Sequence, residues 1–232
     1  MTRTFTDKED ARQAVWDRLQ AEGLARFPFP PHGRIPNFKG AQEAAVRLFQ
    51  LAPWRTAKRI KVNPDAPQRF LPTPRLMGGF KRVDPAKIPK NRIAEAASLS
   101  KGKQWAEDIP LEELPRMDAI VCGSVAVSRD GRRCGKGEGY SDLEYAMLRE
   151  LGHPPVPVAT TVHAVQIVDA LPWDEIDLPL SVIVTPEETI QIKSPPPAPN
   201  GIAWDRLTEK DFEEMPLLAA LRNLRSSNSA TR

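Results

Sequence analysis

Apolar side chains recur every three or four residues in three segments of the chain, which predicts amphipathic helices. In the first segment Ala11, Val15 and Leu19 fall on one face, and Thr6 or Asp7 is available as the N-cap. The predicted helices span residues 7–22, 40–53 and 139–152, and the second closes at a proline.

Short apolar runs rich in valine and isoleucine alternate with these helices and predict strands. A weaker run at 68–72 predicts one more short strand. Since strands alternate with helices, the pattern indicates an α/β fold with a largely parallel sheet covered on both faces. The stronger predicted strands span 57–62, 117–128, 155–162, 178–186 and 188–192.

Proline divides the chain into an α/β domain, 1–193, and an extension, 194–232. The extension opens with "SPPPAPNG", which is typical of a polyproline-type linker. One or two helices are predicted at 208–224 and a frayed tail at 225–232.

Composition indicates a compact globular protein, because 41% of the 232 residues are hydrophobic and 27% are charged. The net charge of +3 is spread along the chain, so a nucleic-acid-associated protein is the weakest hypothesis. Two cysteines suit a reducing compartment. With neither a long apolar run nor a signal-peptide pattern, we expect a cytoplasmic protein without a membrane partner.

Three glycines alternate with other residues in "RRCGKGEGYSD", residues 132–142, between a predicted strand and a predicted helix. Gly135, Gly137 and Gly139 permit positive φ and let backbone N–H groups approach a ligand closely. The spacing is not that of a P-loop, and a plain surface turn is an equally good interpretation of the glycines alone.

Charged residues in the same stretch favour an anion. Arg133 and Lys136 would add positive charge, and the start of the following helix would direct its dipole at a phosphate. Asp142, in the first turn of that helix, is a candidate magnesium ligand. Cys134, beside Arg133, is expected to have a lowered thiol pKa.

The region 117–187 resembles the signature of the 5-formyltetrahydrofolate cyclo-ligase family. "KEDAR" is similar to the family's N-terminal KxxxR pair, and "FLPTPRL" and "VHAVQIVDALPWDEIDLPLSVIVTPE" resemble its later motifs. The resemblance extends over about 7–192. The positions that match the family's glycine-rich motif are Arg133, Gly135, Lys136, Gly137, Gly139, Tyr140 and Asp142.

This resemblance implies a three-layer α/β/α, Rossmann-like fold akin to the sugar-isomerase and CoA-transferase type. It also implies that ATP and Mg²⁺ drive closure of 5-formyltetrahydrofolate to 5,10-methenyltetrahydrofolate, with release of ADP and phosphate. The implied catalytic residues are Lys136 and Arg133, and the implied metal ligand is Asp142. The implied ATP-binding residues are Lys8, Arg12, Arg133, Gly135, Lys136, Gly137, Gly139, Tyr140 and Asp142. Tyr140, Ser141 and Gln166 are the candidate substrate-binding residues.

Two features depart from the family pattern. Ser141 stands where many members have a second aromatic residue, and Gly123 and Ser124 stand where Pro-Gly is common. The alternative is therefore a diverged nucleotide-binding member without folate activity, acting in another cofactor pathway such as that of thiamine. In either case we expect a small-molecule substrate and a monomer or homodimer.

Overall fold

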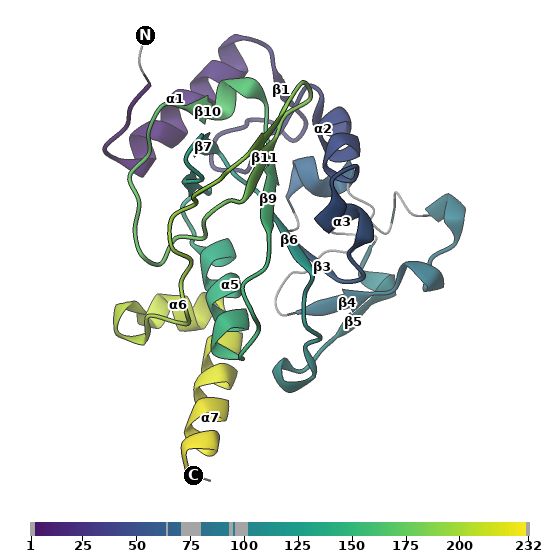
Figure 1. Ribbon diagram of the computed structural model, residues 1–232, viewed down its shortest axis with the longest axis vertical. Helices are drawn as coiled ribbons and strands as arrows, with labels where there is room; N and C mark the ends of the chain where they lie inside the picture. The colour runs from purple at the N-terminus through teal and green to yellow at the C-terminus, as the bar shows by residue number, and fades with distance from the viewer. Residues whose placement is uncertain (1–2, 64, 71–79, 93–94, 96–101, 231–232) are drawn as a thin grey trace.

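A mostly parallel sheet forms the centre of the computed structural model, which describes residues 3–63, 65–70, 80–92, 95 and 102–230 (Figure 1). Four strands in the order β11-β9-β6-β3 make three parallel pairings, and β12 pairs antiparallel with β11 at one edge. The strands are β3 (Ile60–Val62), β6 (Ala119–Cys122), β9 (Val158–Thr161), β11 (Val182–Val184) and β12 (Thr189–Gln191). The predicted α/β class with a largely parallel sheet is confirmed.

The apolar run at 117–128, predicted as one strand, is divided between two sheets. After β6 the chain leaves the central sheet at Gly123 and enters β7 (Ala126–Ser128). There β7 pairs parallel with β10 (Ile167–Val168) and antiparallel with β8 (Arg133–Cys134). This small sheet brings the start of the glycine-rich stretch beside the carboxyl end of β6.

The first helix, α1 (Lys8–Ala21), is confirmed, and Asp7 caps it by accepting hydrogen bonds from the N–H groups of Glu9 and Asp10. The single helix predicted at 40–53 is wrong, because α2 (Ala41–Leu48) ends and α3 (Ala52–Thr56) begins separately. Pro53 falls in the first turn of α3, where a missing N–H costs no helical hydrogen bond.

The remaining elements surround the sheet, and among the described residues they are as follows. The other helices are α5 (Tyr140–Glu150), α6 (Glu209–Glu214) and α7 (Leu217–Ala230), and the other strands are β1 (Ala25–Arg26), β2 (Asn37–Phe38), β4 (Lys81–Val83) and β5 (Ala106–Asp108). Short 3₁₀ helices are η1 (Ala66–Phe70), η2 (Pro85–Lys87), η3 (Lys90–Arg92), η4 (Gly102–Trp105), η5 (Leu111–Glu113), η6 (Ala164–Gln166) and η7 (Trp204–Arg206).

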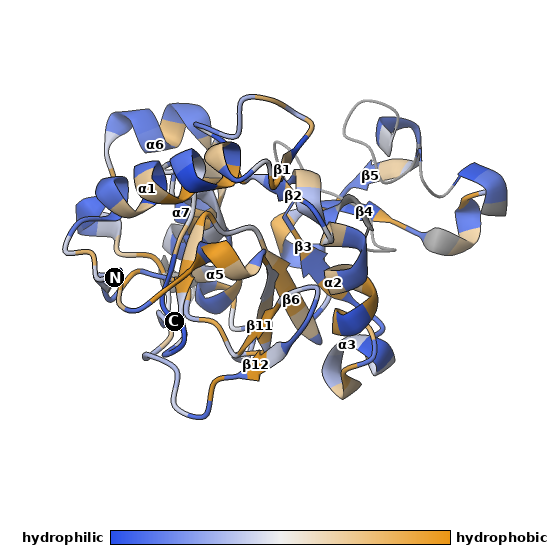
Figure 2. Ribbon diagram, turned by 90° about the horizontal axis from the view of Figure 1, so that it is seen from above, coloured by the Kyte–Doolittle hydropathy of each residue, from blue (hydrophilic) through white to orange (hydrophobic). Residues whose placement is uncertain are grey.

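Two hydrophobic cores lie on opposite faces of the sheet. Along β6, Ala119 and Val121 belong to the core beneath α1 and α2, and Ile120 and Cys122 belong to the core beneath α5 and α7. This alternation is the period of two expected of a strand buried on both faces. Figure 2 shows the apolar strands inside and the largely hydrophilic α1 and α6 outside.

Three local predictions need correction. The strand predicted at 68–72 is wrong over 68–70, which belong to η1, and 71–72 lie outside the described residues. The β4–β5 hairpin was not predicted. The tail predicted to fray from 225 is helical as far as Ala230. Within the part of the chain that the structure describes, no helix combines the length and the apolar content that a bilayer crossing requires.

The extension packs into the second core through Leu218 and Leu221, which are 0% and 2% exposed. The boundary at 193/194 stays a prediction, but the two segments share buried surface. Figure 1 shows α7 beside α5, with its C-terminal end reaching beyond it.

We expect Leu218→Ala to lower the free energy of unfolding by about 2–5 kcal/mol, because it leaves a cavity in the core beneath α5. Leu224→Ala is the matched control, since Leu224 on the same helix is only partly buried, and it should cost less. Urea denaturation measures both. Equal small losses would contradict the packing of α7 into the core.

Candidate functional site

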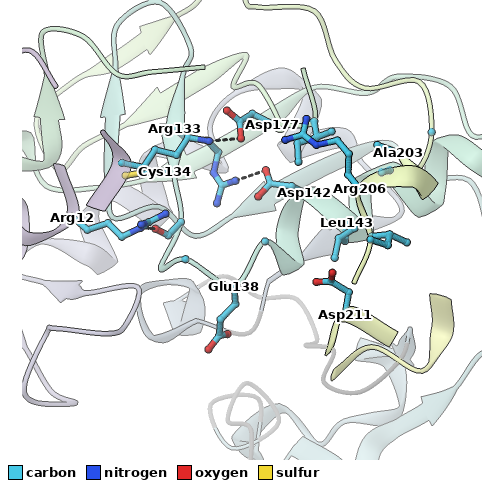
Figure 3. Close-up of a pocket in the computed structure, with 18 residues that line it drawn as sticks. Arg12, Arg133, Cys134, Glu138, Asp142, Leu143, Asp177, Ala203, Arg206 and Asp211 are labelled. Carbon is cyan, nitrogen blue, oxygen red and sulfur yellow. Dashed lines mark hydrogen bonds and ion pairs between the residues drawn. The ribbon is translucent and has the colours of Figure 1, made fainter. Parts of the chain in front are cut away.

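A cavity of about 330 Å³ lies at the start of α5, within the size range of ligand pockets (Figure 3). Five segments form its walls: α1, the glycine-rich loop, α5, the loop after β10 and the C-terminal extension. The lining residues are Lys8, Arg12, Arg133, Cys134, Gly135, Gly137, Glu138, Gly139, Asp142, Leu143, Ala146, Ile176, Asp177, Gly201, Ala203, Arg206, Leu207 and Asp211.

The glycine-rich loop connects β8 to α5 in a conformation that requires glycine. Gly137 and Gly139 have φ of +115° and +66°, which other residues rarely adopt. Gly139 is the N-cap of α5, and among the described residues no side chain caps the start of this helix. The Asp142 N–H donates to the Gly139 carbonyl, so the two N–H groups before it and the helix dipole are available to an anion.

Arg133 is the most extensively bonded side chain of the site. It is 3% exposed, and it donates from Nη1 to Asp142 Oδ1 and from Nη2 to the Gly123 carbonyl, both at 2.8 Å. Asp142 Oδ1 also accepts from the Leu178 N–H at 2.8 Å. Burial opposes the charge on Arg133, but the adjacent Asp142 carboxylate raises the pKa of the guanidinium above its usual value.

Lys8 and Arg12 project from one face of α1 into the cavity, one helical turn apart. Arg12 Nε donates to the Gly135 carbonyl at 2.8 Å, and Arg12 Nη1 pairs with Glu9 at 2.7 Å. Lys8 Nζ pairs with Asp177. The first helix therefore holds the glycine-rich loop although more than 120 residues separate them.

Charges in the cavity wall balance. Four cationic side chains (Lys8, Arg12, Arg133 and Arg206) line it together with four acidic ones (Glu138, Asp142, Asp177 and Asp211). Each cation also has a carboxylate partner, on the wall or just behind it. An entering anion must share these cations with their carboxylates or displace the carboxylates.

Three of the candidate residues lie beside the cavity and not in its wall. Lys136 Nζ pairs with Glu138 at 2.5 Å and lies 5.9 Å from the centre of the Tyr140 ring. The Tyr140 hydroxyl donates to Glu214 at 3.0 Å, and Ser141 is partly buried in the first turn of α5. Their predicted roles in binding ATP or substrate stay predictions, because none of the three lines the cavity.

Gln166 is enclosed by the protein. It is 0% exposed, its Nε2 donates to the carbonyls of Ser124 and Val125 at 3.1 Å, and its Oε1 accepts from the His163 N–H. These three hydrogen bonds to backbone groups are enough to explain why a glutamine is buried here. Its predicted contact with substrate finds no support in this arrangement.

Sequence reasoning missed a buried polar cluster formed by Lys61, Asn63, Asp65 and Glu144. Lys61 is 2% exposed, pairs with Glu144 and donates to Asn63 at 2.8 Å, and Asn63 donates to Glu144 at 3.1 Å. Neighbouring Gln68 is fully buried, and neither polar atom of its amide has a partner among the described residues. Only the alternation of polar and apolar residues in "IKVNPD" could have indicated the cluster.

Asp65 of this cluster packs closely against Gly123, whose carbonyl accepts a hydrogen bond from Arg133. A side-chain carbon at Gly123 would lie 2.3 Å from Asp65 Oδ2, so only glycine leaves room for the carboxylate. Burial, which outweighs the opposing charge of Lys136, raises the pKa of Asp65 to about 6. Asp65 can therefore gain or lose a proton near neutral pH.

The thiol prediction for Cys134 is wrong. Cys134 is 2% exposed, and burial raises its pKa although Arg12 and Arg133 act in the opposite direction. His163 accepts a hydrogen bond from the Val165 N–H at the start of η6 and has a structural role there.

No group of three or more His, Cys, Asp or Glu side chains among the described residues is arranged to hold a metal ion.

The contribution of the extension to the cavity was also missed, because no local motif in 201–211 indicates a ligand.

The other residues that line the cavity lie in a region that matches a known protein family. The model of the 5-formyltetrahydrofolate cyclo-ligase family matches residues 8–186. The chain belongs to the 5-formyltetrahydrofolate cyclo-ligase family. The glycine-rich loop, Lys8 and Arg12 all lie within the family region, and the extension lies beyond it.

Similarity to individual proteins agrees with the family. A methenyltetrahydrofolate synthase domain-containing protein of Bos taurus is 40% identical over 241 residues, covering 95% of this chain and 63% of that protein. The 5-formyltetrahydrofolate cyclo-ligase of Escherichia coli K12 is 35% identical over 75 residues, covering 32% of this chain and 40% of the enzyme. The solved 5,10-methenyltetrahydrofolate synthetase of Aquifex aeolicus covers 81% of this chain and 93% of its own, with a TM-score of 0.47 and 16% identity.

We expect Asp142→Ala to lower the free energy of unfolding by about 3–5 kcal/mol, because it leaves the Arg133 guanidinium buried without its carboxylate. Asp108→Ala removes the exposed partner of Lys81 and should change stability by less than about 1 kcal/mol. Chemical denaturation of both variants makes the comparison. Similar losses in the two variants would show that the Arg133–Asp142 pair does not support the fold.

Asp65→Asn should stabilise the protein more at pH 8 than at pH 4. The pKa of Asp65 is raised in the folded protein, so its contribution to stability falls as pH rises from about 4 to above 6. The difference between the two pH values should be about 1–3 kcal/mol. Urea denaturation at both pH values measures it, and an effect independent of pH would contradict the raised pKa.

Proposed function

We propose that the protein is an ATP- and Mg²⁺-dependent cyclo-ligase that converts 5-formyltetrahydrofolate to 5,10-methenyltetrahydrofolate. The observation that carries the proposal is the meeting of the glycine-rich loop, the start of α5 and two cations of α1 around one cavity. Membership of the cyclo-ligase family supplies the reaction. The chain spans 63% of the length of the Bos taurus relative, and the activity is inferred for the chain itself.

The triphosphate would occupy the end of the cavity formed by the loop and α1. Positive φ at Gly137 and Gly139 turns the backbone, and the uncapped start of α5 offers N–H donors. Lys8 and Arg12 would bind phosphate oxygens in place of Asp177 and Glu9. Phosphoryl transfer chiefly requires such positioning and charge neutralisation.

Magnesium fits this cavity as an ion bound jointly by protein and nucleotide. Mg²⁺ commonly binds one or two carboxylates together with substrate phosphates and keeps several waters. Asp142 is the carboxylate we propose, although its Oδ1 already accepts from Arg133 and Leu178. A contact through its other oxygen or through water leaves the Arg133 pair intact. The ion would neutralise phosphate charge.

The reaction needs no protein nucleophile. The γ-phosphoryl group passes to the formyl oxygen and ADP leaves. The N10 nitrogen of the folate then attacks the formyl carbon and loses its proton, and the C–O bond breaks, so that phosphate leaves and takes up that proton. We place the reacting formyl group beside Lys136, whose Nζ lies 5.9 Å from the centre of the Tyr140 ring.

On this proposal Lys136 would stabilise the transferring phosphoryl group, and Arg133 would hold the loop through Gly123 and Asp142. Tyr140 and Ser141 would border the folate. We also infer the finer properties that the resemblance and composition imply: a Rossmann-like, sugar-isomerase or CoA-transferase type of fold, a cytoplasmic protein and a monomer or homodimer.

The second candidate function is nucleotide binding without folate chemistry, in a pathway such as that of thiamine. Ser141 favours it, because a hydroxymethyl group cannot stack on a pteridine as an aromatic ring does. Wild-type protein that binds ATP but forms no methenyl product would select this alternative.

We expect the wild type to form 5,10-methenyltetrahydrofolate from 5-formyltetrahydrofolate, ATP and Mg²⁺, followed by its near-ultraviolet absorbance. Arg12→Ala should lower kcat/KM for ATP by about 10- to 100-fold, because it removes a charge-assisted hydrogen bond to phosphate. Arg18→Ala, on the same helix but outside the cavity wall, should leave kcat/KM within about twofold. An unaffected Arg12→Ala variant would exclude Arg12 from the ATP site.

A further inference from the structure

The C-terminal extension supplies five of the residues that line the cavity, although it lies outside residues 8–186 of the family match. Figure 3 shows Arg12 at one end of the cavity, Arg133 and Asp142 in the middle, and Leu143, Ala203 and Asp211 at the other end. We infer that residues 201–211 bind the nucleoside half of ATP. This inference rests on the proposed function, since it concerns the same nucleotide.

The two ends of the cavity differ in chemistry. Glycines and cations form the end near α1, as a triphosphate requires. Figure 3 shows Leu143 and Ala203 at the end away from Arg12. The other apolar side chains of the wall are Ala146 from α5, Ile176 from the loop after β10 and Leu207 from the extension. A purine ring gains from burial between such apolar surfaces, and a phosphate does not.

The extension wall is held in place before any ligand arrives. Glu150, at the end of α5, accepts from the Ile202 N–H at 3.1 Å and from Trp204 Nε1 at 3.4 Å. Arg206 donates two hydrogen bonds of 2.7 Å to the Asp174 carboxylate. A wall anchored at two points loses little conformational entropy on binding, which favours affinity.

Asp211 adds a polar group to this end. Its Oδ2 accepts from the Thr208 N–H and hydroxyl, both at 2.7 Å, so the carboxylate has a fixed orientation at the start of α6. Carboxylate oxygens are acceptors for the hydroxyl groups of a ribose. Apolar side chains with one oriented carboxylate, beside an Arg206 whose charge is paired with Asp174, therefore match a base joined to its sugar.

The test compares ATP with inorganic tripolyphosphate, which carries the phosphates but no nucleoside. Calorimetric titration with Mg²⁺ present is performed on the wild type, Leu207→Ala and Leu224→Ala, the last removing a leucine of α7 outside the cavity wall. We expect Leu207→Ala to weaken ATP binding about 5- to 30-fold and to leave tripolyphosphate within about twofold. Leu224→Ala should affect neither ligand.

A second variant makes the same comparison possible if Leu207→Ala does not fold. Ala203→Phe adds a ring to the same end and should exclude ATP while still admitting tripolyphosphate. Equal weakening of both ligands, or of neither, in the folded variants would overturn the inference and leave the proposed function standing. Failure of the wild type to bind either ligand would overturn the nucleotide site itself, and the inference with it.

Discussion

The buried guanidinium of Arg133 is the interaction on which the rest of the site depends. One planar group binds the carbonyl where the chain leaves the central sheet and the carboxylate in the first turn of α5. A charge enclosed in protein is stable only while such partners remain, so the positions of three separate segments are fixed together. The glycine-rich loop starts from this fixed point. Its shape follows from where Arg133 must sit.

The paired charges of the cavity define how an anion can enter. Lys8 and Asp177 come from segments far apart in sequence, and their pairing joins α1 to the loop after β10. A phosphate that binds would take the place of a carboxylate beside each cation, so no cation would be left unpaired. The cations lose most of their water when the protein folds, because the carboxylates already replace it, and phosphate binding therefore adds little desolvation cost.

Local patterns predicted most of the elements and the composition of the glycine-rich loop. Period-two and period-3.6 signals identified α1, α5 and the parallel strands because these elements bury a regular face. The same signals failed at 117–128, because both halves are apolar and the change of sheet at Gly123 leaves no break in the pattern. The residue type of Gln166 suggests a substrate contact, and its side chain has three protein partners that periodicity does not encode. Contacts between distant segments, such as Asp65 against Gly123 or the extension against α5, leave no periodic trace.

Helix α5 acts as a spacer between two walls. Its first turn carries Asp142, which is tied to the glycine-rich loop, and its last residue, Glu150, holds the extension. Eleven helical residues span about 16 Å and hardly stretch. The distance between the loop and the anchor of the extension is therefore set by a count of residues and not by loop packing. An insertion or deletion of a single residue within this helix would rotate one wall by about 100° relative to the other, so the length of α5 is itself a determinant of what the cavity can hold.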